Sequence, residues 1–202
     1  MNTPIHFNQA KFLISAVKLG GCPTEIVAEV AFIGRSNSGK SSAINALTNQ
    51  KGLAKTSKTP GRTQLINFFA LANNLALVDL PGYGYAKVTD SIKASWEKMV
   101  TSYLIDRIQL QGLVILMDIR HPLKDIDLQM INWSVSSQLP THVLLTKADK
   151  LKKGAAKTQL LAVQKSLSQI SPDISVQLFS SQSRQGVDEL AKVASNWLTI
   201  PS

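Results

Sequence analysis

The chain has 202 residues, of which 44% are hydrophobic and 17% charged, and its formal net charge at pH 7 is +9. This composition is typical of one globular domain with a full core, and the basic excess favours a polyanionic partner. The single cysteine, Cys22, excludes an internal disulfide. No apolar run is long enough to span a bilayer, and the N-terminus lacks a signal-peptide pattern. We therefore expect a cytoplasmic protein that does not bind membranes.

Short apolar runs alternate along the chain with stretches of helical spacing. We predict strands at 29–34, 65–71, 75–80, 112–119, 141–149 (with its loop) and 174–181, and helices at 39–49, 91–108, 125–138, 155–170 and 186–198. Asn73 and Asn74 tolerate the positive φ of a tight turn, so the second and third strands should form a hairpin.

This alternation predicts an α/β fold with a mostly parallel six-stranded sheet, one antiparallel strand and helices on both faces. We expect residues 1–22 to be an N-terminal extension packed on the domain, and residues 23–202 to form that single domain. In such sheets ligands bind where the C-terminal ends of the strands meet the loops, and each motif below lies at such an end.

The segment "GRSNSGKS" matches the phosphate-binding pattern G-x-x-x-x-G-K-[ST] and lies between a predicted strand and a predicted helix. Its glycines let the backbone N–H groups point at phosphate oxygens. Lys40 adds a charge for the outer phosphates, and the Ser41 hydroxyl can ligate Mg²⁺. The predicted phosphate-binding residues are Gly34, Arg35, Ser36, Asn37, Ser38, Gly39, Lys40 and Ser41.

Two later segments favour guanine as the base. In "TKAD" (146–149), the Asp149 carboxylate can accept from both N1–H and the exocyclic amine of guanine, whereas adenine would leave it unpaired at a cost. The Lys147 stem can lie across the base, and Thr146 replaces the commoner asparagine. In "FSSQ", the Ser181 N–H can face the guanine O6. The predicted contacts are Thr146, Lys147, Ala148, Asp149, Phe179, Ser180 and Ser181.

Two further segments can sense the last phosphate. In "DLPG" (79–82), Asp79 would hold Mg²⁺ through a water and the Gly82 N–H would contact the γ-phosphate. In "KTPGRTQ" (58–64), a threonine can complete the Mg²⁺ shell only while that phosphate is present, which is a switch between order and disorder. We assign this role to Thr63 rather than Thr59 because it lies just before a predicted strand.

The series GRSNSGKS, TPGRT, DLPGYGYA, TKAD and FSS resembles the bacterial EngB-type GTPases over nearly the whole chain. The resemblance implies a Ras-like domain that binds GTP and GDP, requires Mg²⁺, assists assembly of the large ribosomal subunit and is needed for normal division septum formation. It also implies metal ligation by Ser41 and Thr63, and further nucleotide contacts at Gly61, Arg62, Thr63, Gln64, Leu65, Asp79, Leu80, Pro81 and Gly82.

Tyr83 follows the DLPG glycine, where many GTPases carry a glutamine that positions the attacking water. Tyrosine is a poor base because its ordinary pKa is about 10, but phosphoryl transfer depends mainly on positioning and charge. We therefore expect slow intrinsic hydrolysis, supported by Lys40, Thr63 and Gly82 and accelerated by a partner. Asn37 either ligates potassium, as in related GTPases without the glutamine, or caps a turn with its side chain.

The nature of the partner follows from charge. Residues 34–62 contain six basic and no acidic residues, which favours ribosomal RNA or a pre-ribosomal particle, although a solvated basic surface is the alternative. We expect a monomer. Two other classes stay open: a phosphate-loop kinase or ATPase, which TKAD disfavours, and a nucleotide-gated scaffold with negligible turnover.

Overall fold

The computed structural model describes residues 4–55, 65–83 and 90–199, without the side chains of residues 90–97. The strands are β1 (Lys11–Ala16), β2 (Ala28–Gly34), β3 (Ile66–Ala70), β4 (Leu75–Asp79), β5 (Leu110–Asp118), β6 (Thr141–Thr146) and β7 (Ser175–Leu178). The α-helices are α1 (Lys40–Leu47), α2 (Asp90–Asp106), α3 (Asp125–Ser136), α4 (Lys153–Ile170) and α5 (Val187–Leu198).

The strands form one sheet in the order β1-β3-β4-β2-β5-β6-β7. Strand β3 runs antiparallel to both of its neighbours, β1 and β4, and the remaining pairs are parallel. The predicted α/β fold with one antiparallel strand is confirmed. The turn between β3 and β4 has φ values of 60° at Asn73 and 57° at Asn74, as the hairpin requires.

The predicted number of six strands is wrong, because β1 adds a seventh at the edge of the sheet. Its sequence, KFLISA, has no alternation of apolar and polar residues, and Phe12, Leu13 and Ile14 are all exposed. A bulge between Phe12 and Ile14 also shifts its register against β3. Periodicity therefore gave no strand signal here.

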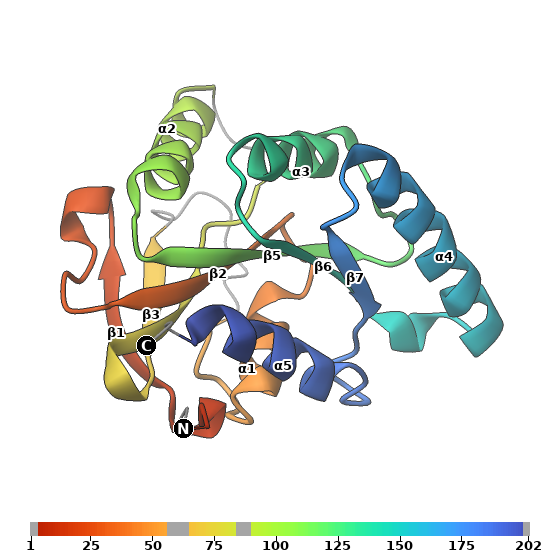
Figure 1. The fold of residues 1–202 in the computed structure, drawn as a ribbon, viewed down its shortest axis with the longest axis horizontal. Helices are drawn as coiled ribbons and strands as arrows, with labels where there is room; N and C mark the ends of the chain where they lie inside the picture. Colours follow the sequence, from red (N-terminus) through yellow and green to blue (C-terminus); the bar gives the residue numbers. More distant parts are fainter. Residues whose placement is uncertain (1–3, 56–64, 84–89, 200–202) are drawn as a thin grey trace.

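Helices cover both faces of the sheet, as predicted: α2, α3 and α4 lie on one face, and α1 and α5 on the other (Figure 1). Each face has its own hydrophobic core. The central strand β2 is buried along its whole length, which fits a strand covered on both sides. Gly112 in β5 leaves room for the Trp197 ring of α5, which a β-carbon at that position would strike.

A buried ion pair lies at the N-terminal end of β2. The guanidinium of Arg107 donates from Nε and Nη2 to the two carboxylate oxygens of Glu29, both over 2.9 Å. Tyr103 also donates its hydroxyl to Glu29, and the Arg107 Nη2 donates to the Pro23 carbonyl over 2.8 Å. This cluster joins the C-terminal end of α2 to the sheet, on the side away from the sequence motifs.

Candidate nucleotide-binding site

The phosphate loop joins the C-terminal end of β2 to α1, and its backbone needs its glycines. A β-carbon on Gly34 would lie 2.5 Å from Ser38 Oγ and 2.6 Å from the Leu116 carbonyl oxygen, so only glycine fits there. Gly39 has φ +94° and Asn37 has φ +63°. Asparagine is one of the few residues that adopts this left-handed conformation readily.

The loop presents the groups that an anion requires. Helix α1 begins at Lys40, and no side chain caps its N-terminus, so the first N–H groups have no partner inside the helix. Ser38 Oγ is buried and has no hydrogen-bond partner among the described residues. A phosphate held at this helix N-terminus would satisfy such donors.

Lys40 and Asp79 bring the phosphate loop and the end of β4 into direct contact, because the Lys40 ammonium forms an ion pair with the Asp79 carboxylate. Ser41 Oγ lies nearby on α1 and donates to the Lys55 carbonyl over 3.4 Å. A hydroxyl and a carboxylate are the hard oxygen donors that Mg²⁺ prefers. No group of three or more His, Cys, Asp or Glu in the described part of the chain could hold a metal.

The DLPG segment packs directly on the phosphate loop. A β-carbon on Gly82 would lie 3.0 Å from the Gly34 carbonyl oxygen. Beyond it, the Tyr83 N–H donates to the Gly34 carbonyl over 3.2 Å, and the Ser36 N–H donates to the Tyr83 carbonyl over 3.0 Å. The residue that directly follows the glycine predicted to sense the last phosphate is therefore paired with the phosphate loop.

The Tyr83 side chain is buried against α3. Its hydroxyl donates to Asp127 Oδ1 over 2.9 Å, and Arg35 Nε lies 3.3 Å from Asp127 Oδ2. Burial first, and then the Asp127 charge, raise the Tyr83 pKa well above its ordinary value. The phenol therefore stays protonated at neutral pH and cannot act as a base.

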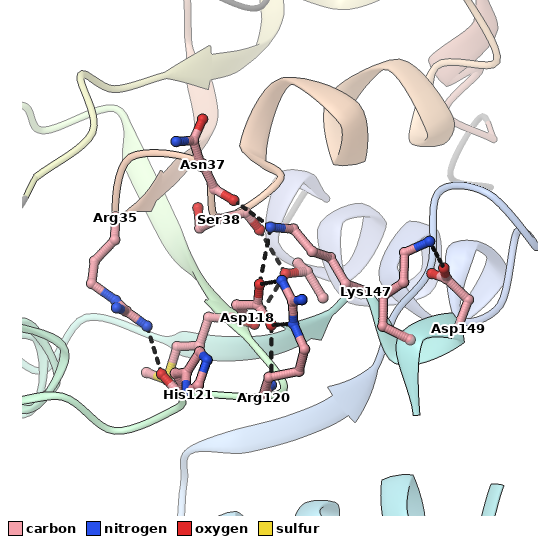
Figure 2. A network of polar contacts seen from close by, with 11 residues as sticks. Arg35, Asn37, Ser38, Asp118, Arg120, His121, Lys147 and Asp149 are labelled. Carbon is pink, nitrogen blue, oxygen red and sulfur yellow. Dashed lines mark hydrogen bonds and ion pairs between the residues drawn. The ribbon is translucent and has the colours of Figure 1, made fainter. Parts of the chain in front are cut away.

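The TKAD segment is attached to the phosphate loop by two side chains, those of Thr146 and of Lys147, the second of which is labelled in Figure 2. The Lys147 ammonium donates to the Asn37 carbonyl over 2.8 Å and lies 2.9 Å from Asp118 Oδ2. The Thr146 hydroxyl lies 2.6 Å from the Ser38 carbonyl and 3.1 Å from the Met117 carbonyl, and can donate to either. Thr146, at a position where asparagine is commoner, thus links the TKAD segment to the phosphate loop.

Asp149 is oriented by its neighbours. Ser180 Oγ donates to Asp149 Oδ1 over 2.6 Å, and the Lys150 ammonium lies 3.4 Å from Asp149 Oδ2. The Ser180 hydrogen bond is the main reason that the Asp149 pKa lies below its ordinary value. The carboxylate is therefore ionised at neutral pH and can act only as an acceptor, as guanine recognition requires.

The sequence-predicted residues divide into three groups. Those of the phosphate loop and TKAD, with Asp79 and Gly82 of DLPG, are brought together at one edge of the sheet, and Ser180 joins them through Asp149. Leu80 and Phe179 are buried in the hydrophobic cores, and Leu65 is half-buried beside β3. Gly61, Arg62, Thr63 and Gln64, together with Thr59, lie outside the described residues.

Sequence reasoning missed four residues of this region: Asp118, Arg120, His121 and Asp127. Asp118 ends the buried strand β5, so the strand-end rule that selected Asp79 also applied to it. Asp127 gave no such signal, since it lies within α3 and meets Arg35 and Tyr83 only in the fold. His121 contributes its carbonyl oxygen, which accepts from Arg35 Nη2 over 2.6 Å.

Comparison with known proteins identifies the family. A family model described as "50S ribosome-binding GTPase" matches residues 29–147. The chain is 54% identical to a probable GTP-binding protein EngB of Coxiella burnetii (strain CbuK_Q154), over 96% of this chain and 94% of the relative. The chain belongs to the EngB family of GTP-binding proteins. The predicted resemblance is confirmed.

A second EngB relative, from Escherichia coli (strain K12), is 53% identical over 98% of this chain and 94% of the relative. Among solved structures, one of a probable GTP-binding protein EngB has a TM-score of 0.68 at 21% identity and covers 85% of this chain and 98% of that one. A structure of Era has a TM-score of 0.65 at 22% identity, covering 88% of this chain and 58% of that one. At these identities the two structures establish the shared fold alone.

Proposed function

We propose that this EngB protein is a slow GTPase whose nucleotide state switches its association with the assembling large ribosomal subunit. The observation that carries the proposal is the convergence of Lys40, Asp79, Gly82, Lys147 and Asp149 at one edge of the sheet. We also propose that it works in the cytoplasm and is needed for normal division septum formation. Among the described residues, no helix is both long and apolar enough to cross a membrane.

The charges at the site suit a nucleoside triphosphate with Mg²⁺. Lys40 and Asp79 neutralise each other in this structure, and they would hold the outer phosphates and, through a water, the metal. Ser41 would ligate the metal directly, and we propose that Thr63 completes the shell. When bound, Mg²⁺ supplies positive charge against the transferring phosphoryl group.

The chain's own contribution to hydrolysis is positioning and charge. Lys40 and the N–H groups of the phosphate loop and of Gly82 would face the charge that builds up on the γ-phosphate. The buried, protonated Tyr83 cannot activate the attacking water. We therefore propose a slow intrinsic rate that a ribosomal partner increases by ordering the loops near the phosphate.

Two observations support an RNA-rich partner. The family model is described as a 50S ribosome-binding GTPase. The six basic residues between 34 and 62, with no acid among them, would attract the phosphates of such a partner.

Sedimentation with ribosomal subunits tests the proposal. We expect the protein to move with the large subunit when it is loaded with a non-hydrolysable GTP analogue, and to be released with GDP. Binding should weaken as salt rises. Association with the large subunit that depends neither on the bound nucleotide nor on the salt concentration would contradict the proposal. Single-turnover hydrolysis with and without subunits separates a switch from a scaffold with negligible turnover.

Potassium near Asn37 remains a separate hypothesis. Hydrolysis should be faster in potassium than in sodium salts, and Asn37→Asp, which tolerates the same backbone conformation, should change that difference. Equal hydrolysis rates in potassium and sodium salts would mean that Asn37 serves only the turn of the phosphate loop.

A further inference from the structure

We propose that Asp118, at the C-terminal end of β5, is a positioning residue for guanine nucleotide binding, because it holds the Lys147 ammonium against the phosphate loop. The inference rests on the proposed nucleotide site, and it assigns a task to a residue outside the phosphate loop, DLPG and TKAD. Its basis is the Lys147 ammonium, which contacts both Asp118 at the end of β5 and the Asn37 carbonyl in the phosphate loop, as Figure 2 shows.

Lys147 is held at its end by two acceptors from different parts of the chain. Its Nζ lies 2.9 Å from Asp118 Oδ2 and donates to the Asn37 carbonyl over 2.8 Å. The Lys147 backbone lies in the left-handed region, with φ +58°. Without Asp118 only the carbonyl would hold the ammonium, and the long side chain would regain part of its rotamer freedom.

Asp118 is itself fixed by Arg120. The Arg120 backbone N–H donates to Oδ1 over 3.0 Å, Nε donates to Oδ1 over 2.9 Å, and Nη2 donates to Oδ2 over 2.7 Å. The Asp118 side chain is only 13% exposed. These hydrogen bonds, with Lys147, keep the Asp118 pKa far below its ordinary value, so the carboxylate is ionised throughout the neutral range.

The position of the contact between Asp118 and Lys147 determines which part of nucleotide binding it affects. Lys147 precedes Ala148 and the base-reading Asp149, and its stem, 31% exposed as a side chain, is the surface on which a base would lie. Asp79 and Gly82, which would sense the γ-phosphate, make no contact with Asp118 that the described structure records. Loss of Asp118 should therefore weaken GTP and GDP binding by the same factor.

The test measures affinities for GDP and a non-hydrolysable GTP analogue by calorimetry. We expect Asp118→Asn to weaken both about tenfold, in the range of interaction energies between contacting charged residues. Asp118→Glu should restore part of the loss. Asp125→Asn, which changes an exposed carboxylate at the start of α3, is the matched control and should bind as the unchanged protein does.

A double-mutant cycle with Lys147→Ala distinguishes positioning from a general structural effect. If Asp118 acts through Lys147, Asp118→Asn should cause no further loss of affinity in the Lys147→Ala background. Losses that multiply, or an Asp118→Asn variant that binds as the unchanged protein does, would overturn the inference. Should Asp118→Asn fail to fold, Arg120→Gln, whose side chain is 45% exposed, tests the same arrangement and should cause a smaller loss that also vanishes with Lys147→Ala.

The cycle also separates this inference from the function on which it rests. If Lys147→Ala alone binds guanine nucleotides unchanged, the proposed base site is wrong, and the role of Asp118 fails with it. If Lys147→Ala weakens binding and Asp118→Asn does not, the base site stands and only the positioning role fails.

Discussion

The Tyr83 hydroxyl donates to Asp127 Oδ1 over 2.9 Å, and both side chains are buried. The residue that replaces the water-positioning glutamine of many GTPases is thus part of the packing between the DLPG segment and α3. The Lys124 N–H also donates to Asp127, to Oδ2 over 3.0 Å. Burial is the main reason that the Asp127 pKa is raised, and the contacts from Tyr83 and Arg35 oppose that rise.

Tyr83→Phe removes the hydroxyl and keeps the ring. We expect the free energy of unfolding to fall by about 1–3 kcal/mol, because a buried acceptor loses a donor. Single-turnover hydrolysis should change little, since the hydroxyl takes no part in the chemistry. Urea unfolding and a single-turnover assay on the same samples measure both. A large loss of rate with unchanged stability would show that the hydroxyl acts in catalysis.

Gly34→Ala should abolish nucleotide binding, because its β-carbon would meet Ser38 Oγ and the Leu116 carbonyl. Gly154→Ala is the control: a β-carbon at this position in α4 meets nothing within 4 Å. The control should bind nucleotide normally and gain about 0.4–1 kcal/mol of stability. GDP titration and thermal unfolding measure the two effects. Normal binding by Gly34→Ala would contradict the packing described for the phosphate loop.

The buried ion pair between Glu29 and Arg107 leads to a prediction about stability alone. Arg107→Met leaves the Glu29 carboxylate buried without its charged partner, and should cost about 3–5 kcal/mol. Adding Glu29→Leu should recover much of this loss, because the unpaired charge is then gone. The pair lies at the end of the sheet opposite the nucleotide site, so GDP affinity of the folded variants should not change. An Arg107→Met variant as stable as the unchanged protein would contradict the expected cost of burying the Glu29 carboxylate without its partner.

His142 should make stability depend on pH. Its ring nitrogens lie 2.7 Å from Ser175 Oγ and 2.8 Å from Gln177 Oε1, and burial lowers its pKa. Above about pH 6.5, the ordinary value, the ring is neutral in the folded and unfolded chain and stability is complete. Below it the unfolded chain binds a proton that the folded chain resists, so stability falls, by at most about 1.4 kcal/mol per pH unit.

Urea unfolding at several pH values between 7.5 and 5 measures this dependence. In His142→Asn the slope of stability against pH should be smaller than in the parent, because that proton can no longer bind. Identical slopes in the two proteins would show that His142 is not the group responsible.

The sequence predicted those parts of the site whose chemistry is confined to a few consecutive residues. The spacing of Gly34, Gly39 and Lys40 follows from how a backbone wraps an anion, and Asp79 and Asp149 follow apolar strands whose ends meet at one edge. Strand β1 was missed because its exposed side chains do not alternate. The environment of Tyr83 was missed because Asp127 is 44 residues away in the chain and the contact exists only in the fold.

The central claim is that Asp149 selects guanine at a site whose phosphate end is the loop from Gly34 to Ser41. Calorimetry with GTP, GDP and ATP tests it most directly, together with Asp149→Asn. We predict that ATP binds at least about a thousandfold more weakly than GTP, because adenine leaves the carboxylate unpaired. Asp149→Asn should weaken GTP binding and improve binding of xanthosine triphosphate, whose C2 carbonyl can accept from the amide. Equal affinity for GTP and ATP in the unchanged protein would contradict the account.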